Sequence, residues 1–394
     1  MPTHRKRHKA KVKPLAKRPP FECIALLLQG GGALGAYQAG VYEAFAEADL
    51  HPDWLAGISI GAINSAIIAG NRPEERVAKL RRFWEGITEG AGWQVPLDLG
   101  SAAARGDLFR GWVNQWSAAL TLFQGVPGFF KLRNPTPWMQ PDGTLEATSY
   151  YDTAALKSTL EGLIDFDRIN HSGNRFSVGA VNVRSGNFVY FDTATHVIGV
   201  EHIMASGALP PGFPAVEIEG EFYWDGGLVS NTPLQWVLES REKRQDTLAF
   251  QVDLWSALGD FPSNMGEVAV RQKEILYSSR TRAATTQFKY QQMLRNTVGS
   301  LIEKLPPELK DSAEAQMLKP LADGKVYNIV HLIYRAKQYE GDTKDYEFSR
   351  RTMEEHWTAG YNDAARTLRH PEVLRRPDKL EGVFTFDFGA HGRF

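Results

Sequence analysis

Cysteine is nearly absent from this chain, and so are long hydrophobic runs. Cys23 is the single cysteine among 394 residues, so no disulfide can close within the chain, which fits a reducing compartment. No stretch reaches about 18 uninterrupted apolar residues, because the most apolar one, residues 54–70, is broken by Ser59, Asn64 and Ser65. These absences exclude a disulfide scaffold, argue against a membrane span and favour a cytoplasmic protein.

The composition shows no bias toward disorder or a fibrous repeat. Hydrophobic residues make up 43% of the chain and charged residues 23%, as in an ordinary globular protein. At roughly 150 residues per domain the length suggests two or three units, although large α/β enzymes often keep such a length in one domain.

Acidic residues are missing from the first twenty positions, which carry eight lysines and arginines. The remaining chain holds 37 basic and 46 acidic residues. We therefore expect a disordered basic arm over residues 1–20, whose residues 2–20 can contact an anionic membrane or polymer surface. A solvated tail is the alternative. A secretory signal is disfavoured because the next apolar run is short and processing near Ala33 would cut a glycine motif. No specific nucleic acid is expected as a partner.

Strands and helices alternate in the first part of the chain. The apolar run 23–28 predicts a strand buried on both faces, and apolar spacings of three and four within 36–48 predict a helix after it. A strand at 54–58 and a helix at 62–69 follow, and Pro73 opens a third helix. This alternation predicts an α/β fold with a mostly parallel sheet.

Periodicity weakens between residues 93 and 148, where aromatic residues cluster among prolines and glycines. We interpret this stretch as an insertion that forms either an apolar lid over the site or a satellite core. Its aromatic residues include Trp93, Phe109, Trp112, Trp116, Phe123, Phe129, Phe130 and Trp138.

Beyond the insertion, strands give way to helices along the chain. Further strands are expected at 176–183, 188–191, 216–218, 222–224 and 248–254, then a mostly helical stretch at 264–304, a strand at 325–334 and a long helix at 348–368. We accordingly expect a main domain over 21–253 that carries the insertion, and a C-terminal helical region, 254–394, with one strand, packed on that domain.

A serine lies between two glycines where the second strand meets its helix, in Gly57-Ile58-Ser59-Ile60-Gly61. This is the strand-turn-helix context of a nucleophile elbow. Gly57 and Gly61 leave room for the sharp turn, and the helix N-terminus favours developing negative charge. Ser59 is therefore a candidate nucleophile.

A glycine run follows the first strand, in Gly30-Gly31-Gly32-Ala33-Leu34-Gly35. The backbone amides of Gly30, Gly31, Gly32 and Ala33 can form an oxyanion hole at a helix start. The same run matches the dinucleotide-binding fingerprint, with Asp53 as its ribose-binding acid. That alternative fits poorly, because the acid should end the second strand and Asp53 precedes it.

A candidate base, Asp225, ends a later strand and is followed by Gly226 and Gly227, which allow close approach to a neighbouring loop. An aspartate hydrogen-bonded to a serine hydroxyl can accept its proton, although it is a weaker base than imidazole. Alternatively, Asp225 only caps a turn, or a histidine completes a Ser-His-Asp triad. The histidines weighed for that role are His196, His202, His331, His356, His370 and His391.

Taken in this order, the three motifs resemble those of the patatin-like phospholipase family. The glycine run resembles its oxyanion-hole motif, the Ser59 turn its nucleophile elbow, and Asp225-Gly226-Gly227 its Asp-Gly-Gly/Ala motif. Residues 205–214 are similar to the segment that leads into the family's aspartate. The likeness covers about residues 21–253. It departs at Gln29, where plant members have an acid, and at Leu34, where many have Arg or Lys.

The resemblance implies a three-layer α/β/α fold and a Ser59–Asp225 dyad without histidine, metal or cofactor. It implies hydrolysis of acyl esters in lipids, as by a phospholipase or lysophospholipase. The single cysteine and the basic arm place this activity in the cytoplasm, with contact at the membrane periphery. Two alternatives remain. One is a thioesterase or acyltransferase that uses the same acyl-enzyme, and the other is a catalytically silent protein that binds lipid or polymer granules.

Overall fold

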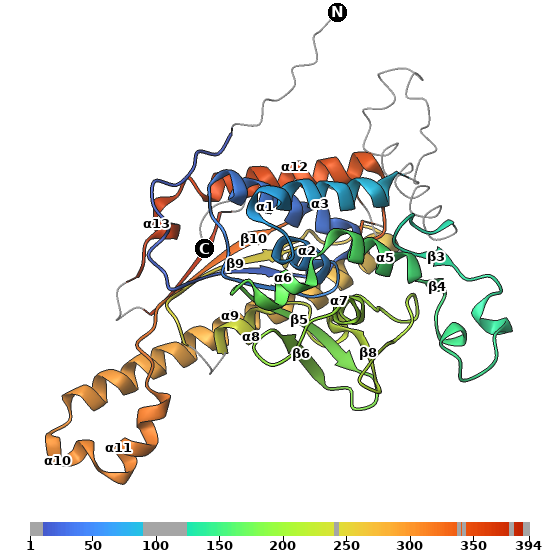
Figure 1. Cartoon of the computed structure of the whole chain (residues 1–394). Coiled ribbons are helices and arrows are strands. Elements are labelled where there is room, and N and C mark those ends of the chain that lie inside the picture. Colours follow the sequence, from blue (N-terminus) through green and yellow to red (C-terminus); the bar gives the residue numbers. More distant parts are fainter. Residues whose placement is uncertain are drawn as a thin grey trace, which may run out of the picture.

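The computed structural model describes residues 11–89, 124–239, 244–336, 340, 344–377 and 382–388. Within these residues lies a nine-stranded sheet of order β11-β10-β9-β1-β2-β5-β8-β7, with β6 paired to β5 (Figure 1). Neighbours from β11 to β5 pair in parallel, whereas β6, β7 and β8 form antiparallel pairs. Its strands are β1 (Cys23–Leu28), β2 (Trp54–Gly57), β5 (Arg175–Asn182), β6 (Phe188–Asp192), β7 (Val216–Ile218), β8 (Glu221–Asp225), β9 (Thr247–Asp253), β10 (Tyr327–Ile333) and β11 (Val383–Asp387). The expected mostly parallel α/β sheet is confirmed.

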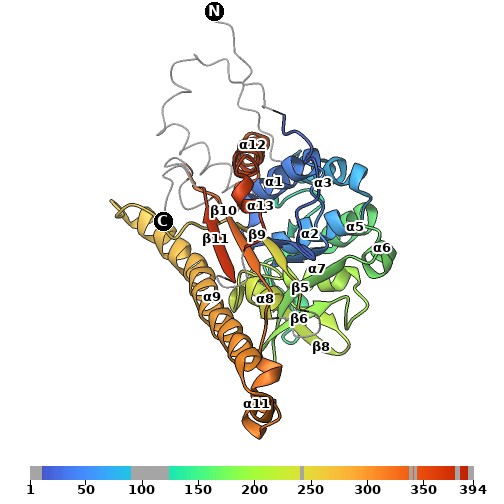
Figure 2. The same ribbon diagram turned by 90° about the vertical axis from the view of Figure 1, so that its left-hand side faces the viewer.

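Helices cover both faces of this sheet, so the fold has three layers. Figure 2 shows α1, α3 and α12 on one side and α8 and α9 on the other. The longer helices are α1 (Ala36–Glu47), α2 (Ile60–Ala69), α3 (Pro73–Thr88), α5 (Ala154–Leu163), α9 (Met265–Lys304) and α12 (Arg350–Thr367). The shorter ones are α6 (Phe166–His171), α7 (Val200–Ser206), α8 (Leu234–Glu239), α10 (Pro307–Lys310), α11 (Ala313–Leu318) and α13 (Pro371–Leu374).

Strand β1 explains why two helical layers are needed. Its alternate residues Ile24, Leu26 and Leu28 belong to the larger hydrophobic core, whereas Cys23, Ala25 and Leu27 belong to a second core with residues of α8 and α9. A strand that is apolar on both faces is buried only when helices cover both sides.

The C-terminal region completes the central sheet. Strands β9, β10 and β11 pair in parallel next to β1, so the boundary expected at residue 253 falls inside one sheet. The expectation of one C-terminal strand is also wrong, because β10 and β11 both lie there. Helix α12 packs along α1, where the glycines Gly40 and Gly360 sit against the facing helix backbone.

The second half of the basic arm lies on the folded body. The Leu15 amide donates to the Ala48 carbonyl at 2.9 Å, Arg18 forms an ion pair with Asp53, and Pro19 is buried. The expectation of a disordered arm over all of 1–20 is therefore wrong for residues 11–20, since apolar and charged groups there find partners. Residues 1–10 lie outside the described ranges.

Part of the aromatic insertion can be described. Residues 93–123 lie outside the described ranges, but Phe129 and Phe130 are buried in the main core and contact Phe213 and Phe348. These two side chains pack as core residues, but in the main core and not in the separate satellite core that was expected. Trp138, by contrast, is 85% exposed. The lid interpretation stays a prediction.

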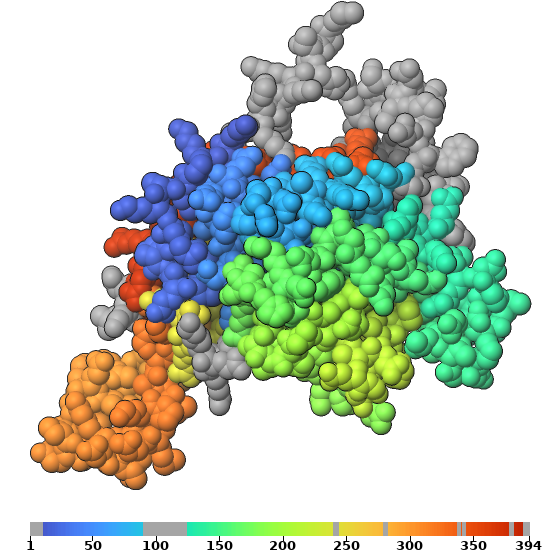
Figure 3. Space-filling model, viewed as in Figure 1, coloured from blue at the N-terminus to red at the C-terminus, as the bar shows by residue number. Residues whose placement is uncertain are grey.

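A helical arm projects from the sheet edge at which β10 begins. Helix α9 is 40 residues long and continues into α10 and α11, which stand clear of the body (Figures 1 and 3). None of the helices in the described ranges combines the length and hydropathy that crossing a bilayer requires.

Candidate functional site

Ser59 occupies a sharp turn between β2 and α2. Its backbone has φ 56° and ψ −125°, a conformation that costs a non-glycine residue about 1–3 kcal/mol and recurs at functional sites. The turn is tight because α2 starts directly against the end of β1: a Cβ at Gly61 would overlap the Leu28 carbonyl. A Cβ at Gly57 would likewise overlap Gly61. Both glycines of the motif therefore lie where a side chain has no room.

The Ser59 amide is held by another serine, Ser206 at the end of α7. It donates to Ser206 Oγ at 3.0 Å, and that hydroxyl donates to the Gly179 carbonyl of β5 at 2.7 Å. Ser206 is fully buried. The strained turn is thus tied to the neighbouring strand.

Asp225 reaches Ser59 from the antiparallel strand β8. Asp225 pairs with Ala180 of β5. This position is two residues after Val178, which pairs with Gly57 at the end of β2. The Asp225 side chain lies close enough to Ser59 for that residue to affect its pKa, and it accepts the Gly227 amide at 2.7 Å. A Cβ at Gly226 would crowd the Gly179 carbonyl, so a small residue is needed for this approach.

The environment of Asp225 changes its acidity. Burial raises the pKa of its carboxyl to about 6, against the opposing effect of the neighbouring Ser59 side chain and of the Gly227 amide. A carboxylate with a pKa near 6 is a better proton acceptor than an ordinary one, and above that pH it is still ionised.

The glycine loop runs beside Ser59 and opens the short 3₁₀ turn Gly32–Gly35 before α1. A Cβ at Gly30 would lie 3.1 Å from Ser59 Cβ, so the loop and the serine are immediate neighbours. The Gly30 carbonyl accepts hydrogen bonds from Asn231 Nδ2 and Trp255 Nε1, both at 3.0 Å.

Two of the four candidate oxyanion amides already have partners. The Gly30 amide donates to the Asn231 carbonyl at 3.3 Å, and the Ala33 amide donates to the Asp345 carbonyl at 2.8 Å. Within the described residues, the amides of Gly31 and Gly32 donate to no backbone carbonyl. These two are the amides left for a ligand.

Gln29, one of the departures from the family pattern, anchors the loop. Its Oε1 accepts the backbone amides of Leu254 and Trp255 at 2.7 and 3.2 Å, and its carbonyl accepts Gln38 Nε2 at 2.6 Å. Leu34, the other departure, is fully buried in the main core. Both residues are fully buried and contact other parts of the protein.

Sequence reasoning did not single out Asn231, Trp255 or Asp345. Asn231 follows Asp225 after a short loop, and this closeness in sequence was a weak indication that it lies near the site. The other two lie in the C-terminal region, and only the sheet topology brings them to the glycine loop.

The histidines weighed for a triad lie elsewhere. Within the described residues, none forms a hydrogen bond with Ser59 or Asp225; the contacts of His196, His202, His331, His356 and His370 are with other groups. His391 lies outside the described ranges.

The dinucleotide alternative is contradicted by the position of Asp53. Its side chain accepts the Ile24 amide at 2.7 Å, which places it where β1 and β2 begin. The glycine loop follows the opposite ends of these strands. An acid at the far edge of the sheet cannot contact a ribose bound at the loop.

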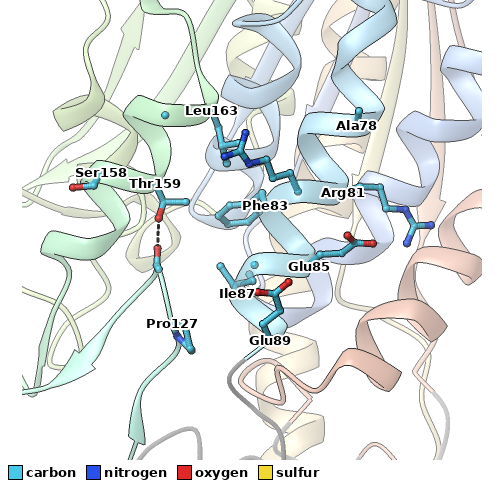
Figure 4. Close-up of a pocket in the computed structure, with 14 residues that line it drawn as sticks. Ala78, Arg81, Phe83, Glu85, Ile87, Glu89, Pro127, Ser158, Thr159 and Leu163 are labelled. Atoms are coloured by element: carbon cyan, nitrogen blue, oxygen red, sulfur yellow. Dashed lines mark hydrogen bonds between the residues drawn. The ribbon is translucent and has the colours of Figure 1, made fainter.

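A cavity of about 660 Å³ lies between α3, residues 127–128 and α5 (Figure 4). Phe83, Ile87 and Leu163 supply apolar lining, with Arg81 and Glu85 among its polar residues. Neither Ser59 nor Asp225 lines it, so this cavity is separate from these two residues. In the described part of the chain, no cluster of His, Cys, Asp or Glu could hold a metal ion.

Comparison with known families agrees with these observations. The family model described as patatin-like phospholipase matches residues 26–238, more than half of the chain, and a second, described as patatin phospholipase, matches residues 275–380. The chain belongs to the patatin-like phospholipase family.

Similar proteins carry related names. An uncharacterised NTE family protein of Mycobacterium bovis is 32% identical over 30% of this chain and 20% of its own length. Patatin-like phospholipase domain-containing protein 7 of Mus musculus is 39% identical over 19% of this chain and 6% of its own. Lysophospholipase nte1 of Aspergillus terreus is 36% identical over 22% of this chain and 6% of its own. The matched stretches thus span only a fifth or less of these relatives.

Proposed function

We propose that this chain is a serine-dependent lipid acyl hydrolase in which Ser59 is the nucleophile and Asp225 the proton acceptor. The observation that carries the proposal is the position of Ser59, in a strained turn, beside the buried carboxylate of Asp225. A nucleophile within reach of a base, beside free amides at a helix start, is the arrangement that acyl transfer requires.

In the first half of the reaction, Ser59 Oγ attacks the ester carbonyl carbon while its proton passes to Asp225. The tetrahedral intermediate collapses as the C–O bond to the alcohol breaks, and Asp225 returns the proton to the departing oxygen. Water then attacks the acyl-enzyme and gives its proton to Asp225, and the Ser59–acyl bond breaks as Ser59 recovers that proton.

The amides of Gly31 and Gly32 are the proposed donors to the oxyanion. Negative charge develops on the carbonyl oxygen only during reaction, so donors already fixed in position stabilise the transition state more than the bound ester. Loss of one such donor typically costs about a hundredfold to a thousandfold in kcat.

The substrate class is proposed from the family and its relatives. The name lysophospholipase for the fungal relative favours a phospholipid or lysophospholipid ester. We place the enzyme in the cytoplasm, because a chain with a single cysteine cannot form an intrachain disulfide and so fits a reducing compartment. Peripheral contact to anionic surfaces is proposed through the exposed Lys11, Lys13 and Lys17.

Two alternatives differ in a measurable way. A thioesterase or acyltransferase would share the acyl-enzyme but prefer a thioester or an alcohol acceptor. A silent binding protein would need neither the strained Ser59 turn nor its contact with Asp225.

The direct test is turnover of p-nitrophenyl and phospholipid esters by wild type, Ser59→Ala, Asp225→Asn and the double variant. Each single variant should lose at least a thousandfold in kcat, and the double variant should lose no more than either, because the two residues act as one unit. His356→Gln tests the alternative in which a histidine is the base, and it should keep its turnover if Asp225 is the base. Near wild-type turnover by Asp225→Asn would refute the dyad.

A further inference from the structure

The glycine loop is held from outside by a segment from the C-terminal region. Residues 344–349, which we call the strap, run directly before α12. The Asp345 carbonyl accepts the Ala33 amide at 2.8 Å. The same oxygen lies against Gly32, whose φ is +55° and where a Cβ would overlap it. The loop and the strap therefore fit only with glycine at this position.

Two ion pairs fasten the strap to the first turns of α9. Lys344 Nζ lies 2.6 Å from Glu274 Oε1, and Lys273 Nζ lies 3.1 Å from Asp345 Oδ2. In both segments a lysine is followed directly by an acidic residue. The first residue of each sequence pair therefore contacts the second residue of the other. A slip by one residue would bring Lys273 to Lys344. Charge thus fixes the register of the strap on α9.

The inner ion pair is largely buried. The Lys344 side chain is 4% exposed, and Glu274 also contacts Arg271 at 3.1 Å. A buried pair has a definite geometry because leaving one partner alone is costly. The outer Lys273–Asp345 pair is more exposed and acts mainly on the position of residue 345.

The strap also reaches the other end of the loop through Trp255. Lys344 Nζ lies 5.2 Å from the centre of the Trp255 ring, and Trp255 Nε1 donates to the Gly30 carbonyl. Contacts from the C-terminal region thus bracket the loop at Gly30 and at Ala33. Between them lie Gly31 and Gly32.

We propose that Lys273 and Lys344 are positioning residues for the oxyanion hole. By fixing the strap on α9, they fix the Asp345 carbonyl and, through it, the direction of the Gly31 and Gly32 amides. This inference rests on the proposed function. It assigns the C-terminal region a role in transition-state stabilisation, because a loosened loop loses donor geometry without losing contacts to the bound ester.

The test uses the full chain with Lys273→Met, Lys344→Met and the double variant. Lys325→Met is the matched control. Lys325 pairs with Glu22 at 2.7 Å, and its side chain is exposed to a similar extent, 34% against 39% for Lys273. It lies just before the start of β10, at the edge of the sheet opposite the glycine loop. For each variant we would measure kcat and KM on p-nitrophenyl butyrate and the melting temperature. We would also measure Ki for a trifluoromethyl ketone, whose carbonyl is attacked by the serine to give an adduct that carries an oxyanion.

The double variant should lose about ten- to a hundredfold in kcat, part of the cost of a lost oxyanion donor. Its KM should stay within about threefold, and its Ki should rise by about the same factor as kcat falls. Lys325→Met should keep wild-type kcat and Ki. A merely structural role would lower the melting temperature and leave kcat and Ki of the folded protein unchanged.

Wild-type kcat and Ki in the folded double variant would overturn the inference. If that variant does not fold, Lys273→Met decides: a change of at least about threefold in kcat and Ki with KM unchanged supports the inference, and wild-type values overturn it. Failure of the proposed function looks different, because Ser59→Ala would then keep its turnover. An active wild type, a dead Ser59→Ala and an unaffected strap variant would reject this inference alone.

Discussion

Asp225 lies beside Ser59 and is only 2% exposed. The two residues come from different strands of opposite direction, β2 and β8, and meet beyond the end of β2. A carboxylate is rarely buried beside a single hydroxyl and one amide, because the desolvation of its charge is poorly offset. The cost to stability of this arrangement leads to the first prediction.

Asp225→Asn should stabilise the folded protein at neutral pH. The carboxyl ionises near pH 3.8 in the unfolded chain and at about pH 6 when folded, so the folded state is progressively destabilised as pH rises from about 4 to 6. Each pKa unit corresponds to about 1.4 kcal/mol, so the full penalty above pH 6 is about 3 kcal/mol.

Urea unfolding at several pH values measures this effect. The free energy of unfolding of Asp225→Asn should exceed that of wild type by up to about 3 kcal/mol at pH 7.5, and the difference should vanish near pH 3. An equal difference at both pH values would mean that ionisation of Asp225 is not its cause.

Gly61→Ala should destabilise the fold and abolish the nucleophile turn. Its methyl group would overlap the Leu28 carbonyl, a backbone atom of the central strand that cannot move aside. We expect a loss of at least about 2 kcal/mol in unfolding free energy, measured by urea unfolding.

Gly86→Ala in α3 is the matched control. A Cβ at Gly86 meets nothing within 4 Å, so this change should be neutral or stabilise by up to about 1 kcal/mol. Similar losses of unfolding free energy for the two variants would show that replacing any helix glycine destabilises this protein, and that the tight turn at Ser59 is not the cause.

Replacing the three exposed arm lysines, Lys11, Lys13 and Lys17, with glutamine should weaken binding to anionic vesicles. At about 1 kcal/mol for each basic residue near the surface, the loss can reach about a hundredfold at low salt and should shrink at high salt. Soluble-ester turnover should not change. Deleting the whole arm is a poorer test, because Leu15 and Pro19 pack on the body.

Vesicle sedimentation at two salt concentrations gives the readout. Binding equal to that of wild type would mean that these lysines are only solvated. A fall in soluble-ester turnover would mean that they support the fold.

Trp138→Ser should reduce turnover of long-chain esters more than that of acetyl esters, if the insertion contacts the acyl chain. Trp138 is 85% exposed, so its removal should not disturb the core. Phe261→Ser, at a side chain that is 96% exposed outside the insertion, is the control. Comparing kcat/KM for acetyl and decanoyl esters measures the effect; equal losses on both, or an equal effect of Phe261→Ser, would contradict the lid.

The parts of the fold that sequence predicts are those with local signals. The β1 strand and the Ser59 turn were predictable because an apolar run and closely spaced glycines restrict the backbone locally. Asp225 was expected as the base of Ser59 from the glycines that follow it and from the family resemblance. The antiparallel pairing of β8 with β5, which brings it there, has no local signature in the sequence.

The parts that sequence missed depend on distant contacts. Asp345 has no motif, and its role depends on a main-chain carbonyl that the sheet topology brings to Ala33. Strand β11 is short and lies near the end of the chain, where alternation over Val383–Asp387 is a weak signal. The packed half of the basic arm was missed because Leu15 and Pro19 are isolated among lysines.

Labelling with a fluorophosphonate, followed by peptide mass spectrometry, tests the central claim most directly. The account predicts a single adduct on Ser59, a rate that falls about tenfold for each pH unit below about 6 as Asp225 becomes protonated, and a loss of labelling in Asp225→Asn. An adduct on another residue, or Asp225→Asn labelled as fast as wild type, would contradict it.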